Sequence, residues 1–200
     1  MQSIKEKAIA DGTFMKAPNG KPTNLTERQW LQVRTKNFIN WFGDWINDPS
    51  NASKVVDENG EPLVVYHGDS DIDITNWKVK MKDTITGYFT TNKEKSKLYA
   101  DDGKIYEAFL NIRNPFDWYK DIKKSQELLG PDYSYINKYL AEDVIAEGYD
   151  GIFISKYYNS YLAISSPNQI KSATSNTGEF STTNDDIRYS IVTELQSIEE

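Results

Sequence analysis

The spacing of apolar positions near the start of the chain predicts a helix that follows a polar leader. Residues 1–23 are polar and rich in turn-forming pairs, so we interpret them as a leader or linker. From Trp30 to Trp45, apolar and mostly aromatic residues recur every three to four positions, the period of one helical face. Asn24 and Glu27 have the spacing of a capping box at the start of this helix. We expect the aromatic face to pack on a following sheet, and a base-stacking surface is the alternative.

The remaining pattern alternates between short apolar runs and amphipathic stretches. The predicted strands are 63–67, 87–91, 104–112, 151–155, 161–165 and an edge strand at 187–191; the predicted helices are 92–101, 121–129 and 134–147. Strands in pairs with helices between them indicate an α+β fold and not a regular βαβ series. The predicted organisation is a leader at 1–23, an aromatic helical segment at 24–53, a main domain at 54–191 and an acidic tail at 192–200.

Composition narrows the classes of function. A net charge of -7 over 200 residues argues against a broad basic surface for duplex nucleic acid, although a local patch is compatible with it. The chain has no cysteine and one histidine, so we expect no metal site. It has no apolar run of 18 residues and no apolar signal-peptide core, so we expect no membrane partner. A cytoplasmic location is expected, with export by a route without a cleaved signal as the alternative.

The single histidine stands at the end of a predicted strand, in Tyr66-His67-Gly68. A lone histidine is more often structural than functional. Two further motifs change that balance: the predicted strand Gly87-Tyr88-Phe89-Thr90-Thr91-Asn92, and Tyr99 on the helix that follows it.

In this order, the three motifs resemble the NAD-binding half of ADP-ribosyltransferases of the diphtheria-toxin and poly(ADP-ribose) polymerase type. From about Trp41 to Ser190, the chain resembles more specifically the ADP-ribosyltransferase-like domains in polyvalent proteins of phages and mobile elements. This resemblance implies a split, mixed or antiparallel sheet that cradles NAD, flanked by helices. The motifs that carry it are Trp41-Phe42-Gly43-Asp44-Trp45, Pro167-Asn168-Gln169-Ile170-Lys171-Ser172 and Asp186-Ile187-Arg188-Tyr189-Ser190.

The resemblance also implies which residues bind NAD. Two aromatic rings are expected to clamp the flat nicotinamide, with Tyr99 on one face and Phe89, where the family more often has tyrosine, on the other. Gly68 has no side chain, which lets its backbone approach the carboxamide. A ribose hydroxyl is expected to bond one ring nitrogen of His67, while a neighbour fixes the other. The NAD-binding set is His67, Gly68, Asp69, Tyr88, Phe89 and Tyr99; the alternative is that the tyrosines are core residues.

The chain departs from the family pattern at the position of the catalytic glutamate. Nicotinamide leaves through an oxocarbenium-like state, which a nearby carboxylate stabilises. The family's glutamate is expected just before Tyr161, where this chain has Asn159-Ser160. Ser160 and Gln169 are therefore the two candidates for the third catalytic position, beside His67 and Tyr99. We expect the strand that carries Ser160 to lie beside the strand that carries His67.

The function implied is an NAD-dependent mono-ADP-ribosyltransferase that releases nicotinamide and passes ADP-ribose to a macromolecular acceptor, protein or nucleic acid. Loss of one electrostatic stabiliser typically costs about 3–4 kcal/mol, which predicts a slow enzyme and puts chain elongation in doubt. A non-catalytic module that binds NAD or a partner is the main alternative, and NAD glycohydrolase activity is another. The resemblance implies a toxin-like role in a bacterial or phage-infected cell.

Overall fold

The computed structural model describes residues 1–69, 87–101, 103–120, 127, 138–154, 159–184 and 186–188. Its strands are β1 Val65–Asp69, β2 Tyr88–Thr90, β3 Lys104–Leu110, β4 Pro115–Asp117, β5 Gly151–Ile154, β6 Ser160–Ala163 and β7 Ile170–Ser172. Its helices are α1 Gln2–Ala10, α2 Glu27–Gln32, α3 Lys36–Phe42, α5 Lys93–Ala100, α7 Lys138–Ala146 and the short 3-10 helix η1 Pro167–Gln169.

The strands form one seven-stranded sheet in the order β4-β5-β6-β2-β1-β3-β7. Strands β4 and β5 pair in parallel and all other neighbours pair antiparallel, so the sheet is mixed. The predicted α+β class is confirmed, and the predicted strands at 151–155 and 161–165 form the antiparallel pair β5 and β6. The short edge strands β4 and β7 were not predicted. The predicted helix at 121–129 and the tail at 192–200 lie almost wholly outside the described residues.

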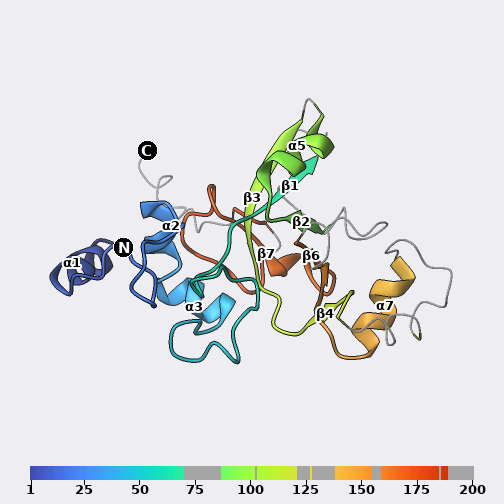
Figure 1. The fold of residues 1–200 in the computed structure, drawn as a ribbon, viewed down its shortest axis with the longest axis horizontal. Coiled ribbons are helices and arrows are strands. Elements are labelled where there is room, and N and C mark those ends of the chain that lie inside the picture. The colour runs from blue at the N-terminus through green and yellow to red at the C-terminus, as the bar shows by residue number, and fades with distance from the viewer. Residues whose placement is uncertain are drawn as a thin grey trace, which may run out of the picture.

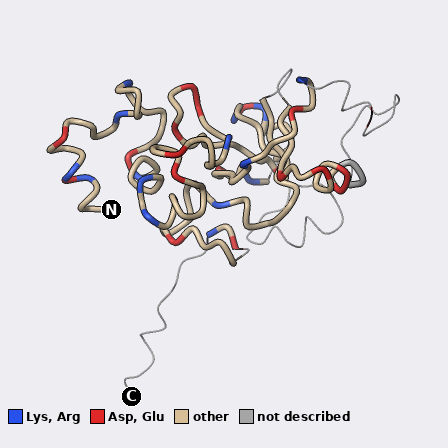
Figure 2. Tube along the Cα trace, turned by 90° about the horizontal axis from the view of Figure 1, so that it is seen from below, with Lys and Arg blue, Asp and Glu red and all other residues tan. Residues whose placement is uncertain are grey.

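The helices lie in three regions of the molecule around this sheet (Figure 1). α1, α2 and α3 gather at one end of the molecule, α7 lies at the other end near β4, and α5 lies against β1 and β3. Charged residues of both signs are interspersed along the described trace (Figure 2). In the described part of the chain, no helix is long and apolar enough to cross a membrane.

The aromatic segment forms two short helices where one was predicted. Thr26 caps α2, and its hydroxyl and the Gln29 side chain make a reciprocal capping box. Thr35 caps α3 by accepting a hydrogen bond from the backbone N–H of Phe38, so a new helix begins there. The prediction that Asn24 is the cap is wrong, because its side-chain amide instead donates to carboxylates of the 57–58 turn.

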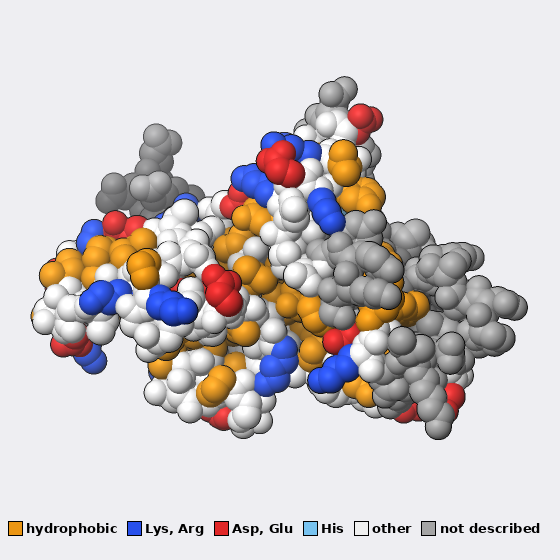
Figure 3. Space-filling view, viewed as in Figure 1, with side chains coloured by type: hydrophobic (Ala, Val, Ile, Leu, Met, Phe, Trp, Pro, Cys, Tyr) orange, Lys and Arg blue, Asp and Glu red, His pale blue; other side chains and the backbone are white. Residues whose placement is uncertain are grey.

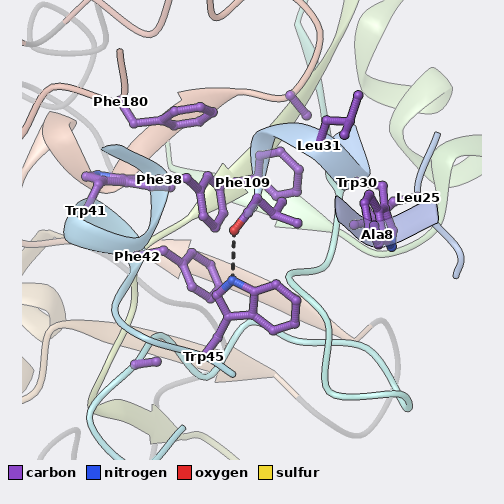
Figure 4. Packing of buried hydrophobic residues seen from close by; sticks show 13 residues of the cluster. Ala8, Leu25, Trp30, Leu31, Phe38, Trp41, Phe42, Trp45, Phe109 and Phe180 are labelled. Carbon is purple, nitrogen blue, oxygen red and sulfur yellow. Dashed lines mark hydrogen bonds between the residues drawn. The ribbon is translucent and has the colours of Figure 1, made fainter. Parts of the chain in front are cut away.

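The predicted packing of the aromatic face on the sheet is confirmed. Phe38 is fully buried, and its ring lies 5.2 Å from that of Phe109 on β3 and 4.9 Å from that of Phe180. Ala8 of α1 belongs to the same cluster, so the polar segment at 1–23 contributes to the core. Figure 4 shows this cluster, with the Trp45 indole N–H donating to the Val33 carbonyl. The aromatic helices and strand β3 therefore contribute to one buried cluster, and the other buried residues of the sheet form two further clusters.

A buried ion pair joins the aromatic helices to the turn before β1. A guanidinium nitrogen of Arg34 lies 2.8 Å from a carboxylate oxygen of Glu61, which is fully buried. The guanidinium also lies 3.8 Å from the ring centroid of Trp30. Burial lowers the pKa of Arg34, and the hydrogen bond and charge of Glu61 oppose that shift. The pair links residues 27 positions apart in the sequence.

Candidate functional site

The strands β1 and β2 separate at the motif that carries the histidine. In the described part of the chain, their ladder consists of the single pair Tyr66↔Thr90. Beyond it, His67, Gly68 and Asp69 continue to pair with β3. The sheet therefore splits along the β2 side of these three residues.

His67 bridges this split. Its Nδ1 atom lies 2.7 Å from the main-chain oxygen of Tyr88 on β2. Since a carbonyl oxygen only accepts hydrogen bonds, Nδ1 carries the proton in this contact. The other ring nitrogen, Nε2, lies 3.3 Å from a carboxylate oxygen of Asp69. The ring orientation is thus fixed from both sides.

Two tyrosines lie beside the split, on the side of the sheet that α5 covers. Tyr88 stands at the start of β2 and Tyr99 near the end of α5, with 37% and 72% of their surface exposed. Burial of its hydroxyl, with a smaller contribution from Tyr99, raises the pKa of Tyr88 to about 12. The two elements that carry these tyrosines, α5 and β2, are in contact.

Phe89 faces the opposite side of the sheet. Successive side chains of a strand point to opposite faces, and Phe89 is only 1% exposed, inside the core below the sheet. Its ring lies 5.4 Å from the His67 ring. Phe89 is therefore not available to stack on nicotinamide in this structure. The exposed aromatic ring of β2 belongs to Tyr88. The phenylalanine at position 89, where the family more often has tyrosine, therefore removes no hydroxyl from the exposed face of the strand.

Gly68 is required by helix packing. A Cβ atom at this position would lie 1.8 Å from the carbonyl oxygen of Ser96 on α5. The backbone of α5 therefore rests directly on β1, which places Tyr99 near the split. The close approach of the nicotinamide carboxamide was already expected to require glycine at position 68. The packing of α5 on β1 is a second requirement for glycine at this position.

Ser160 lies on the strand next to β2. The prediction that its strand neighbours the one carrying His67 is wrong, because β2 stands between β6 and β1. Ser160 pairs with Thr90, which in turn pairs with Tyr66. Directly opposed residues of antiparallel strands share a face, so Ser160 is on the same face as Thr90 and Tyr88. Its hydroxyl cannot carry the negative charge that the family's glutamate provides there.

Gln169 has a structural position. Its side-chain oxygen accepts from the backbone N–H groups of Ser165 and Ser166, at 3.0 and 3.1 Å. Its side-chain nitrogen donates to the carbonyls of Asn111 and Asp150, at 3.1 and 2.7 Å. Four backbone contacts occupy the amide, which is buried. The role of third catalytic residue therefore does not fit Gln169.

One charged cluster near the split was not predicted. Lys93 of α5 lies 2.6 Å from a carboxylate oxygen of Glu107 on β3, and its ammonium lies 5.6 Å from the ring centroid of Tyr66. The hydrogen bond and charge of Glu107 raise the pKa of Lys93. Burial, and then the charge of Glu107, raise the pKa of Tyr66. The cluster became recognisable only once β1, β3 and α5 were placed together.

Side chains of both signs stand on the projection formed by α5, β1 and β3 (Figure 3). Among the described residues, no group of three or more histidine, aspartate or glutamate side chains is arranged to hold a metal ion.

The family model described as ADP-ribosyltransferase in polyvalent proteins matches residues 57–180, which is more than half of the chain. The chain belongs to this family. No curated protein and no solved structure matches it. The matched range begins at the turn before β1 and includes every strand of the sheet.

Membership in the ADP-ribosyltransferase family confirms the resemblance drawn from the motifs. The matched range contains the histidine, the two tyrosines and the segment at 167–172. The motifs at 41–45 and 186–190 lie outside it, although residues of both segments belong to the cores that the sheet shares.

Proposed function

We propose that the chain is an NAD-dependent mono-ADP-ribosyltransferase. The observation that carries this proposal is the position of Tyr88 and Tyr99 beside the split at His67-Gly68. Two exposed aromatic rings next to an open strand edge suit a flat, uncharged leaving group such as nicotinamide. NAD is the substrate that the family uses, and it supplies such a group.

In the proposed reaction, nicotinamide stacks between Tyr88 and Tyr99, and the backbone of Gly68 bonds its carboxamide. His67 orients the dinucleotide through Nε2. The bond between nicotinamide and C1′ of the ribose breaks, and its electron pair leaves with neutral nicotinamide. A nucleophile of the acceptor then attacks C1′ and loses its proton to solvent. The transition state resembles an oxocarbenium ion.

Because position 160 has a serine and no carboxylate, we expect the transfer reaction to be slow. An electrostatic stabiliser of this kind is worth about 3–4 kcal/mol, so its loss slows the reaction by roughly two to three decades. Such an enzyme transfers single ADP-ribose units slowly. The acceptor is a protein or nucleic acid of a bacterial or phage-infected cell, where we place the reaction in the cytoplasm.

The same feature favours a second candidate function. A domain that keeps the stacking tyrosines but lacks the acid is suited to bind NAD, or a partner, without turning it over. Water as the sole acceptor would make the protein an NAD glycohydrolase instead.

The deciding experiment measures nicotinamide release from NAD, alone and with cell extract, together with intact mass spectrometry of acceptors. Tyr99→Ala should abolish release, whereas Leu98→Ala, an exposed neighbour on α5, should not. Nicotinamide with a mass increase of one ADP-ribose on an acceptor supports the transferase. Nicotinamide without any modified acceptor supports the glycohydrolase, and NAD binding without release supports the non-catalytic module.

A further inference from the structure

Helix α5 presents an apolar side chain on the side that faces away from the sheet. Leu98 is 81% and Tyr99 72% exposed, and they are the two most exposed large apolar side chains among the described residues. Ser96 and Ala100 of the same helix are buried and lie against Gly68 of β1. Leu98 is two positions from each of them, which corresponds to about 200° of rotation around the helix. Leu98 therefore points away from the sheet.

Paired charges surround this apolar position. Glu94 lies one helical turn before Leu98, and both of its carboxylate oxygens accept hydrogen bonds from the ammonium of Lys97, at 2.7 and 2.8 Å. Lys93, in the first turn, is paired with Glu107 of β3. Figure 3 shows hydrophobic side chains beside charged ones of both signs on this projection. The charges of Lys93 and Lys97 are thus each balanced by a carboxylate of the same surface.

The composition of this surface distinguishes between two classes of acceptor. A nucleic acid binds mainly through its phosphates, which need several cations whose charge is not already balanced. The net charge of -7 also opposes a polyanionic partner. An apolar centre with a polar rim is instead typical of interfaces between proteins. An aliphatic side chain such as Leu98 gains free energy when an apolar side chain of the partner removes it from water.

We propose that Leu98, with Glu94 and Lys97 around it, is the docking surface for the acceptor of the ADP-ribose, and that this acceptor is a protein with an exposed apolar side chain near its modified residue. The inference rests on the proposed function, in which nicotinamide stacks on Tyr99. Because Tyr99 directly follows Leu98 on the helix, a protein seated on Leu98 lies beside the bound dinucleotide. Contact with Leu98 therefore promotes transfer to the acceptor and has no part in nicotinamide release from NAD alone.

The test incubates the full chain with a bacterial cell extract and NAD that carries a label on its adenosine. Digestion of the products with a protease or a nuclease then shows whether protein or nucleic acid holds the label. Leu98→Asp should lower protein labelling at least about fivefold, the effect of losing one apolar contact of an interface. It should change nicotinamide release from NAD alone by less than about twofold, as expected for an exposed position. Ile9→Asp, at an exposed apolar position of helix α1, is the matched control and should leave both measurements unchanged.

Label on nucleic acid alone would overturn the inference and leave the proposed transferase standing. Equal protein labelling by Leu98→Asp and Ile9→Asp would do the same, because Leu98 would then make no contact with the acceptor. A loss of nicotinamide release from NAD alone in Leu98→Asp would also overturn the inference, since it would assign this residue to the NAD site. Wild-type protein that labels no macromolecule would overturn both the inference and the proposed function.

Discussion

Nδ1 of His67 on β1 lies 2.7 Å from the main-chain oxygen of Tyr88 on β2. This contact connects the two strands just beyond the point where their ladder ends. The other ring nitrogen, Nε2, lies 3.3 Å from a carboxylate oxygen of Asp69. One side chain thus combines a structural contact with the proposed contact to NAD, and substitutions can separate the two.

His67→Asn keeps a side-chain N–H donor near the position of Nδ1 and removes Nε2. We expect its thermal midpoint to stay within a few degrees of the wild type, while NAD affinity falls at least about tenfold, the size of one lost good hydrogen bond. His67→Ala loses both contacts, so stability should fall as well. Thermal unfolding and NAD titration of both variants measure the difference. Equal NAD affinity in His67→Asn and the wild type would show that Nε2 does not contact the dinucleotide.

Removing the hydroxyl of Tyr88 should have little effect on turnover, whereas adding a hydroxyl to Phe89 should lower stability. Tyr88→Phe keeps an exposed ring, so NAD turnover should change by less than about tenfold. Phe89→Tyr places a hydroxyl in the buried core, where an unpaired polar group costs about 1–3 kcal/mol. Chemical denaturation checks the second expectation. A Phe89→Tyr variant as stable as the wild type would mean that the hydroxyl finds a partner.

Gly68→Ala should displace α5, because the added Cβ would lie 1.8 Å from the carbonyl oxygen of Ser96. The expected result is a loss of stability together with a loss of NAD response, as Tyr99 moves with the helix. Gly60→Ala is the matched control. Gly60 has a φ of +79° and open space around it, so that change costs backbone strain alone, about 1 kcal/mol. Circular dichroism melts and nicotinamide release compare the two variants.

Gln169 and Ser160 are the two candidates for the third catalytic position, and substitutions can distinguish them. Gln169→Ala leaves buried backbone groups without partners, so unfolding free energy should fall by about 1–3 kcal/mol or more. Ser160→Glu adds a carboxylate on the face that carries Tyr88 and should raise nicotinamide release by up to about a hundredfold. If Gln169→Ala abolished release without lowering stability, Gln169 would regain its catalytic role.

Glu61→Gln should destabilise the whole protein. The variant leaves the buried guanidinium of Arg34 without its counter-charge, and breaking such a pair costs about 3–5 kcal/mol. Because the aromatic helices pack on strand β3 through Phe109, unfolding should remain a single transition at a lower denaturant concentration. Fluorescence of the tryptophans and far-ultraviolet circular dichroism should report the same midpoint. Separate midpoints would indicate that residues before 57 unfold independently.

The sequence by itself determined the features that depend on a few neighbouring residues. The predicted helix at 92–101 forms as α5 and is capped by Asn92, because a cap needs only its own side chain and the N–H three positions later. Strands β5 and β6 lie largely within two apolar runs, 151–155 and 161–165, that were predicted as strands. The order of the histidine, strand and helix motifs indicated the family, which the match over 57–180 confirms.

Only the tertiary structure decided which residues meet. Sequence pattern could not tell whether Tyr88 or Phe89 faces the split, since a shift of one residue exchanges the two faces of a strand. The placement of β2 between β6 and β1 depends on pairing between distant segments, and it moved Ser160 one strand away from His67. The sequence offered Gln169 as a catalytic candidate, whereas in the structure its amide contacts four backbone groups from three separate segments. Contacts of this kind arise from packing over long sequence distances, which no local pattern of apolar and polar residues encodes.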